Sequence, residues 1–98
     1  MLNVIVVGGG YIGLSHIAAY KQLDNARVVG VVDLNKEVGE KAAEEAGCKH
    51  YSTLEEALEA EKANMVDICV PTFLHEDFVV KAANAKCHVL CEKPVTFT

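Results

Sequence analysis

The opening stretch decides the fold: LNVIVV, residues 2–7, runs directly into GGGYIG, residues 8–13. The first half is almost continuously apolar and rich in β-branched side chains, which is typical of a buried strand in a parallel sheet. The second half has the G-x-G-x-x-G spacing of a phosphate-binding loop between a strand and a helix. Gly8 would turn the chain, Gly10 would leave room for a pyrophosphate, and Gly13 would let the helix pack closely. Because glycine-rich turns are common, the loop alone leaves dinucleotide binding open.

A second predicted strand, residues 27–33, ends on a carboxylate that strengthens this interpretation. Asp33 lies 20 residues beyond Gly13, the spacing at which a dinucleotide-binding unit presents an acid to the adenosine ribose. A carboxylate there accepts hydrogen bonds from the ribose hydroxyls and repels a 2′-phosphate, and no arginine follows at positions 34–35. NAD is therefore favoured over NADP, although the nearby Lys36 weakens this preference.

The remaining chain alternates between predicted helices and strands. Helices are expected over 11–23, 36–46, 54–62 and 72–85, and strands over 48–51, 65–70 and 87–91. Asn35 is expected to cap the second helix, Gly47 to end it, and Ser52 with Glu55 to form a capping box for the third. This alternation predicts a doubly wound parallel sheet of about five strands in a three-layer α/β/α arrangement.

In such a sheet, ligands bind at the carboxyl ends of the strands. Four of these ends carry chemically informative residues. They are the glycine loop at 8–13, Asp33, residues 71–75 and residues 92–94. We expect the four groups to meet at one edge of the sheet.

Length and composition fit one globular domain over residues 1–98, with 51% hydrophobic and 23% charged residues. The net charge of −5 disfavours nucleic acid and anionic membrane surfaces as partners. The chain has neither a membrane-length apolar run nor a secretory signal, so we expect a cytoplasmic protein. Its four cysteines are expected to be reduced, since most of them lie in or beside apolar strand-like runs.

The chain resembles the glucose-fructose oxidoreductase, inositol dehydrogenase and MocA family, abbreviated Gfo/Idh/MocA. The resemblance is carried by GGGYIG with His16 and Asp33, by VPTFLH at 70–75, and by CEKP at 91–94. The Glu-Lys-Pro after a strand is its most specific part, and the match covers essentially the whole chain. It implies a Rossmann-like NAD(P)-binding domain of a dehydrogenase that passes hydride between a nicotinamide cofactor and a hydroxyl carbon of a sugar, polyol or related substrate.

The resemblance also implies roles for individual residues. Gly8, Gly10, Tyr11 and Ile12 would contact the pyrophosphate of the cofactor, and Gly13 would belong to the same cofactor-binding loop. Asp33 would bind the adenine ribose, Glu92 would bind the nicotinamide ribose, and Pro71, Leu74 and His75 would shape the cofactor pocket. Lys93 would be the catalytic residue, placed in the cofactor site and reaching the substrate. A cis peptide bond between Lys93 and Pro94 is implied as well.

Lys93 is a poor candidate for a catalytic base in isolation, because its amine is already protonated at neutral pH. Its expected role is to orient the substrate hydroxyl and to join a proton relay only where a second domain excludes water. His75 is expected to contact the ribose or the pocket, with proton shuttling as the alternative. His16 is expected to be a packing or capping residue.

No metal site is predicted. On a strand, Cys87 and Cys91 would share one face while His88 points to the other, so these ligands would not converge on a zinc ion. His50 and His88 show no partner pattern in the sequence that argues for a function.

Relatives of this family continue into a second, substrate-binding domain, whereas this sequence ends at Thr98. We therefore expect a domain fragment that binds a nicotinamide dinucleotide, meets a sugar or polyol only with a second domain, and is inactive alone. The open edge of the sheet could support a homo-oligomer. The alternative is a stand-alone dinucleotide-binding or sensing module without chemistry.

Overall fold

The computed structural model describes residues 2–69 and 87–91, and within them five strands form one sheet. The strands are β1 (Leu2–Val7), β2 (Ala26–Val32), β3 (Lys49–Tyr51), β4 (Met65–Ile68) and β5 (His88–Cys91). They lie in the order β3-β2-β1-β4-β5, and every neighbouring pair is parallel. The predicted doubly wound parallel sheet is confirmed.

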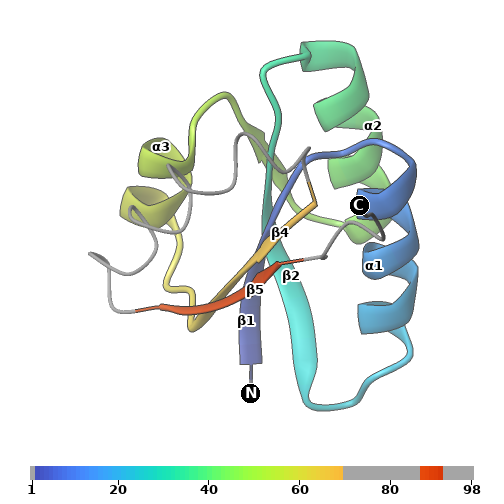
Figure 1. Ribbon diagram of the computed structural model, residues 1–98, viewed down its shortest axis with the longest axis vertical. Coiled ribbons are helices and arrows are strands. Elements are labelled where there is room, and N and C mark those ends of the chain that lie inside the picture. Colours follow the sequence, from blue (N-terminus) through green and yellow to red (C-terminus); the bar gives the residue numbers. More distant parts are fainter. Residues whose placement is uncertain (1, 70–86, 92–98) are drawn as a thin grey trace, which may run out of the picture.

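Within the described ranges, three helices cover the two faces of this sheet. They are α1 (Tyr11–Lys21), α2 (Lys36–Ala46) and α3 (Leu54–Ala60). Helices α1 and α2 lie on one face and α3 lies on the other, which gives the three-layer arrangement (Figure 1). The helix expected over 72–85 falls outside the described residues.

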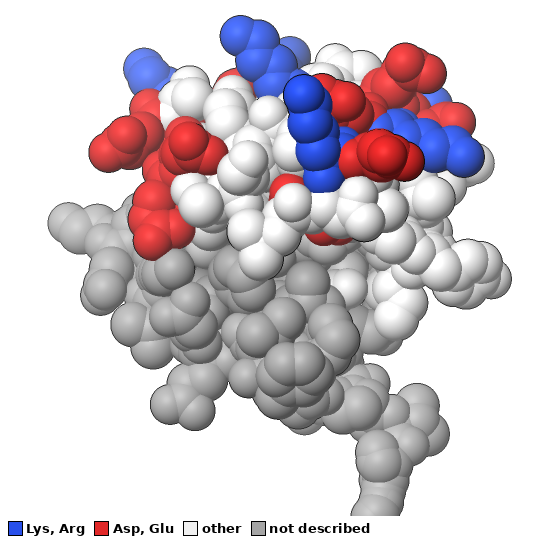
Figure 2. Space-filling view, turned by 90° about the horizontal axis from the view of Figure 1, so that it is seen from above, with Lys and Arg blue, Asp and Glu red and all other residues white. Residues whose placement is uncertain are grey.

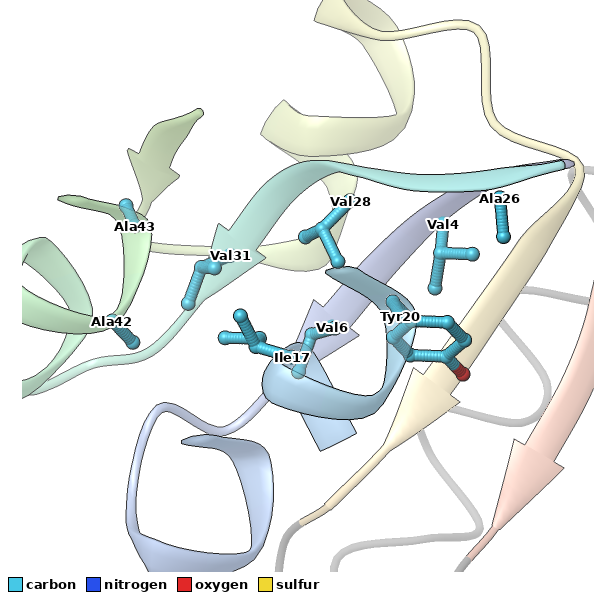
Figure 3. Packing of buried hydrophobic residues seen from close by; sticks show 9 residues of the cluster. All are labelled: Val4, Val6, Ile17, Tyr20, Ala26, Val28, Val31, Ala42 and Ala43. Carbon is cyan, nitrogen blue, oxygen red and sulfur yellow. The ribbon is translucent and has the colours of Figure 1, made fainter. Parts of the chain in front are cut away.

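Strand β1 separates two apolar cores because its side chains alternate between the faces of the sheet. Val4 and Val6 pack into the core beneath α1 and α2, where Ile17 and Tyr20 reach down from α1 (Figure 3). Ile5 and its neighbours on the opposite face pack into the core beneath α3. The β1 side chains in both cores are fully buried, as expected for a central strand covered on two sides, and each valine contributes ~1.5–3 kcal/mol through burial.

The predicted boundaries of α2 are confirmed at both ends. The Asn35 side chain accepts a hydrogen bond from the backbone N–H of Val38 (3.1 Å), which satisfies one of the free donors at the start of the helix. Gly47 ends the helix in the left-handed conformation, at φ 75°, where a residue without Cβ is favoured. Local capping signals therefore suffice to define this helix.

The capping box of α3 is formed by a different pair from the predicted Ser52 and Glu55. Thr53 is the capping residue: its Oγ1 accepts from the Glu56 N–H (3.2 Å), and the Glu56 carboxylate accepts from the Thr53 N–H (3.3 Å). The sequence carries the capping pattern twice in succession, so pattern alone does not choose between them. The structure begins the helix at the fully buried Leu54 and leaves Ser52 exposed.

Two further observations concern the thiols and the helices of the described part of the chain. The Cys69 thiol lies 3.5 Å from Asp67 Oδ1, and the Cys87 thiol donates to the Ala63 carbonyl (3.4 Å). Among the described helices, none has the length and apolar character that crossing a membrane would require.

The two candidate caps of α3 are distinguished by a pair of substitutions. Thr53→Ala should lower the free energy of unfolding by about 1 kcal/mol, because it removes the acceptor for the Glu56 N–H. Ser52→Ala, one position earlier, should change it by less than about 0.5 kcal/mol. Urea denaturation followed by circular dichroism measures both values, and a larger loss for Ser52→Ala would contradict the assignment.

Candidate functional site

The glycine loop makes a tight connection between β1 and α1. Gly8 has a φ of 100°, a conformation that side chains with a Cβ rarely adopt, and its N–H donates to the Val32 carbonyl (2.7 Å). A Cβ on Gly13 would lie only 1.8 Å from the Gly8 oxygen, so the helix approaches the loop as closely as glycine permits. The turning role of Gly8 and the packing role of Gly13 are confirmed.

Gly10 stands at the N-terminus of α1. A Cβ built on Gly10 meets no described atom within 4 Å, and the φ of −77° is available to any residue. The helix has no side-chain cap at this residue and no acidic residue in its first turn. The first N–H groups of a helix have no partner within the helix, so this end suits an anionic group such as a pyrophosphate.

Asp33 lies beside the glycine loop, although it comes from the neighbouring strand. Its Oδ2 accepts a hydrogen bond from the Gly9 N–H at 2.8 Å, and its Oδ1 accepts from the Asn35 N–H at 2.8 Å. Each carboxylate oxygen can accept two hydrogen bonds, so contacts with the described residues leave one acceptor position on each oxygen. The predicted meeting of the loop and the acid at one edge of the sheet is confirmed.

Exposed apolar side chains accompany this loop and acid. Tyr11 and Ile12 in the first turn of α1 are 89% and 44% exposed, and Leu34, directly after Asp33, is 87% exposed. From above, acidic and basic side chains are interspersed along one border, and the described surface beside them is largely uncharged (Figure 2). These features fit a ligand that combines an anionic centre with apolar rings.

The other predicted site residues fall outside the described part of the chain. They are Pro71, Leu74, His75, Glu92 and Lys93, together with the predicted cis bond before Pro94. Strands β4 and β5, which precede them in sequence, run parallel to β1 and end at the same edge of the sheet. Their assigned roles stay predictions.

A buried carboxylate on β4, which the sequence did not single out, contacts α1. Asp67 is fully buried, and its Oδ2 lies 2.6 Å from His16 Nδ1 and accepts from the Tyr20 hydroxyl at 2.7 Å. Figure 3 shows the Tyr20 hydroxyl pointing out of the apolar cluster toward β4. The Cys69 thiol lies 3.5 Å from both Asp67 Oδ1 and His16 Nδ1. The available signal was a single acidic residue inside the apolar stretch 65–70.

His16, Asp67 and Cys69 place three ligand-type atoms within 4.8 Å of one another, which raises the possibility of a metal site. The 2.6 Å separation of His16 Nδ1 and Asp67 Oδ2 is a hydrogen-bond length, whereas two such ligands on one tetrahedral zinc ion lie about 3.3 Å apart. The thiol and the carboxylate also approach the same imidazole nitrogen, so they do not form a nucleophile-histidine-acid chain. We therefore interpret the cluster as a hydrogen-bond network in which His16 packs α1 against β4. This agrees with the expectation that His16 is a packing or capping residue.

The tyrosine in this network stays protonated. Burial, followed by the hydrogen bond to the Asp67 carboxylate, raises the pKa of Tyr20 far above its ordinary value. Its hydroxyl is consequently a permanent donor to Asp67 at physiological pH.

The fold, the loop and the acid together define a dinucleotide-binding domain of the Rossmann type. The model of the Gfo/Idh/MocA family, an oxidoreductase family with an NAD-binding Rossmann fold, matches residues 2–98. The chain belongs to this family, as its sequence motifs predicted. The Rossmann fold of the family binds NAD.

Individual relatives agree with this assignment. Inositol 2-dehydrogenase of Renibacterium salmoninarum is 36% identical over 97% of this chain, and 2,7-anhydro-N-acetylneuraminate hydratase of Escherichia coli is 37% identical over all of it. The crystal structure of GenD2 from gentamicin A biosynthesis in complex with NAD superimposes with a TM-score of 0.91 at 32% identity over 99% of the chain. This chain spans 29%, 26% and 28% of those three proteins, respectively.

The network around Asp67 predicts two different losses of stability. Asp67→Ala removes the acceptor that His16 and Tyr20 share and should lower the free energy of unfolding by about 3–5 kcal/mol. Tyr20→Phe removes one donor from the same oxygen and should cost about 1 kcal/mol. Urea denaturation compares the two variants, and equal losses would show that the carboxylate is not the centre of the network.

Proposed function

We propose that this chain is the nucleotide-binding part of a longer oxidoreductase that acts on a hydroxyl carbon of a sugar, a polyol or a related compound. The bound nicotinamide would supply hydride transfer, and the residues of this chain would bind and orient the cofactor. The observation that carries the proposal is the placement of the Asp33 carboxylate 2.8 Å from the Gly9 N–H, beside the uncapped start of α1.

The site offers one place that suits the pyrophosphate of an adenine dinucleotide and another that suits its adenosine ribose. The open space above Gly10 and the free N–H groups of the first turn suit the pyrophosphate. The remaining acceptor positions of Asp33 suit the adenosine ribose hydroxyls, and its negative charge disfavours a 2′-phosphate. Lys36 follows Asp33 on the first turn of α2, where it is exposed, and Asn35 is engaged as the helix cap. NAD is accordingly proposed as the preferred cofactor over NADP.

The substrate class and the catalytic assignments rest on the family. Inositol 2-dehydrogenase among the matched relatives supports a polyol or sugar hydroxyl, and the hydratase shows that members with this domain differ in their overall reaction. We assign Lys93 as the catalytic residue and Pro71, Leu74, His75 and Glu92 to the cofactor pocket. A second domain would supply the substrate pocket, so the 98 residues by themselves should show no turnover. We further propose that residues 1–98 form one domain, that the protein is cytoplasmic, and that it forms a homo-oligomer.

Binding to the loop is tested by one added methyl group. Gly10→Ala should leave the fold intact, because its Cβ meets no described atom, and should weaken NADH binding at least ~10-fold by displacing the pyrophosphate from the N–H groups. Isothermal titration measures the affinity. Gly13→Ala is the matched control: its Cβ would strike the Gly8 carbonyl, so this change should lower the melting temperature. Unaltered NADH affinity in a folded Gly10→Ala variant would refute the pyrophosphate site.

Cofactor preference is tested at Asp33. The unsubstituted chain should bind NADH more tightly than NADPH. Asp33→Asn should bring the two dissociation constants ~10-fold closer together, because the amide removes the negative charge and can accept from only one of the Gly9 and Asn35 N–H groups. Titration with both dinucleotides gives the ratio of the two constants. Tighter binding of NADPH by the unsubstituted chain would contradict the role of Asp33.

A further inference from the structure

All four polar atoms of Asp33 are engaged. Its N–H donates to the Tyr51 carbonyl (3.1 Å), and its carbonyl lies 2.8 Å from His50 Nε2. Its two carboxylate oxygens accept from the N–H groups of Gly9 and Asn35. Asp33, which we propose binds the adenosine ribose, is thus held by both its main chain and its side chain.

Only one of these four contacts comes from a side chain. The Tyr51, Gly9 and Asn35 partners are backbone groups, which almost any residue at those positions would supply. The His50 imidazole is the partner that an amino-acid change can remove. A carbonyl can only accept, so Nε2 carries the hydrogen and donates it.

The packing around His50 shows that its ring is held tightly in place. A Cβ on Gly39 of α2 would lie 2.2 Å from His50 Cδ2, 2.4 Å from His50 Nε2 and 3.1 Å from Asp33 Cβ. The ring therefore occupies space that exists because position 39 is glycine. In this way α2, β3 and the end of β2 are packed against one another around Asp33.

We propose that His50 is a positioning residue that sets the cofactor preference of this site through Asp33. The inference rests on the proposed binding of NAD. The Asp33 carbonyl belongs to the peptide that leads to Leu34 and then to Asn35, whose N–H binds Asp33 Oδ1. Releasing that carbonyl lets the peptide rotate, and the carboxylate loses its fixed position. A displaced carboxylate binds the 2′-hydroxyl of NAD less well and repels the 2′-phosphate of NADP less strongly.

The test compares two histidine replacements of similar polarity. In His50→Gln the amide nitrogen reaches the place of Nε2, whereas in His50→Asn it reaches only the place of Nδ1. His50→Asn should weaken NADH binding about threefold to tenfold and NADPH binding by less. The dissociation constants of the two dinucleotides therefore become more similar. His50→Gln should restore the ratio of the two constants toward that of the unsubstituted chain. A merely structural role would weaken both dinucleotides alike.

Gly39→Ala provides a second route that leaves the histidine in place. The added methyl group would displace the ring, while alanine in a helix is favoured over glycine, so α2 itself is not weakened. Gly39→Ala should bring the NADH and NADPH dissociation constants closer together, as His50→Asn does. Because the methyl group would also lie 3.1 Å from Asp33 Cβ, an unchanged ratio of the two constants is the decisive result of this variant, and it would overturn the role of His50 if His50→Asn fails to fold.

The outcomes separate this inference from the proposed function. Failure of the unsubstituted chain to bind either dinucleotide would overturn the function and the inference together. Normal binding with a narrowed ratio in Asp33→Asn, but an unchanged ratio in folded His50→Asn and Gly39→Ala, would overturn the role of His50 alone.

Discussion

The hydrogen bond from the Gly9 N–H to the Asp33 carboxylate joins the ends of two neighbouring strands at the edge of the sheet where we propose that the cofactor binds. A parallel sheet brings the carboxyl ends of β1 and β2 to one edge, but it does not by itself hold the loop after β1 in one conformation. The carboxylate supplies that constraint and presents its remaining acceptor positions outward. One side chain thereby organises the loop and offers a binding group, which makes this contact the one on which the rest of the site depends.

Strand order explains why the site lies beside β1. The chain passes outward from β1 to β2 and β3, with α1 and α2 on one face, and then crosses by α3 to β4 on the other side of β1. A doubly wound sheet opens a crevice at such a reversal, because the connections leave the two neighbouring strands in opposite directions. The Cys69 N–H donates to the Val7 carbonyl (2.8 Å), so the end of β4 lies directly against the start of the glycine loop.

Sequence patterns predicted the features that depend on neighbouring residues. The boundaries of α2 follow from Asn35 and Gly47, and the turn after β1 follows from Gly8; these signals act within a few residues. Asp33 was predictable because its spacing from the loop is fixed by one strand-helix-strand unit. The predicted cap of α3 was wrong by one residue. The capping pattern occurs twice in succession, and the burial of Leu54, which selects the second, is a tertiary effect.

Contacts between distant residues were not predictable in this way. His50 lies 17 residues from Asp33, and the sequence shows nothing that pairs an imidazole with a main-chain carbonyl. The partnership of His16 with Asp67 spans 51 residues and depends on which strand lies beside β1. The sequence marks only Asp67 as unusual, because it lies inside the apolar stretch 65–70, and the packing of α1, α2 and β3 on the sheet is needed to assign the partners.

The two unpredicted contacts act on opposite sides of the same loop. On the β2 side, His50 holds the main chain of Asp33, and Asp33 holds Gly9. On the β4 side, Asp67 holds His16 and Tyr20 in α1, the helix whose first turn follows the loop. Burying the Asp67 carboxylate costs free energy, which its hydrogen bonds offset only where the donors are correctly placed, so α1 is favoured in one position along β4. A loop held from both neighbouring strands can keep its N–H groups oriented before any anion arrives, and that preorganisation lowers the entropy that binding would otherwise have to overcome.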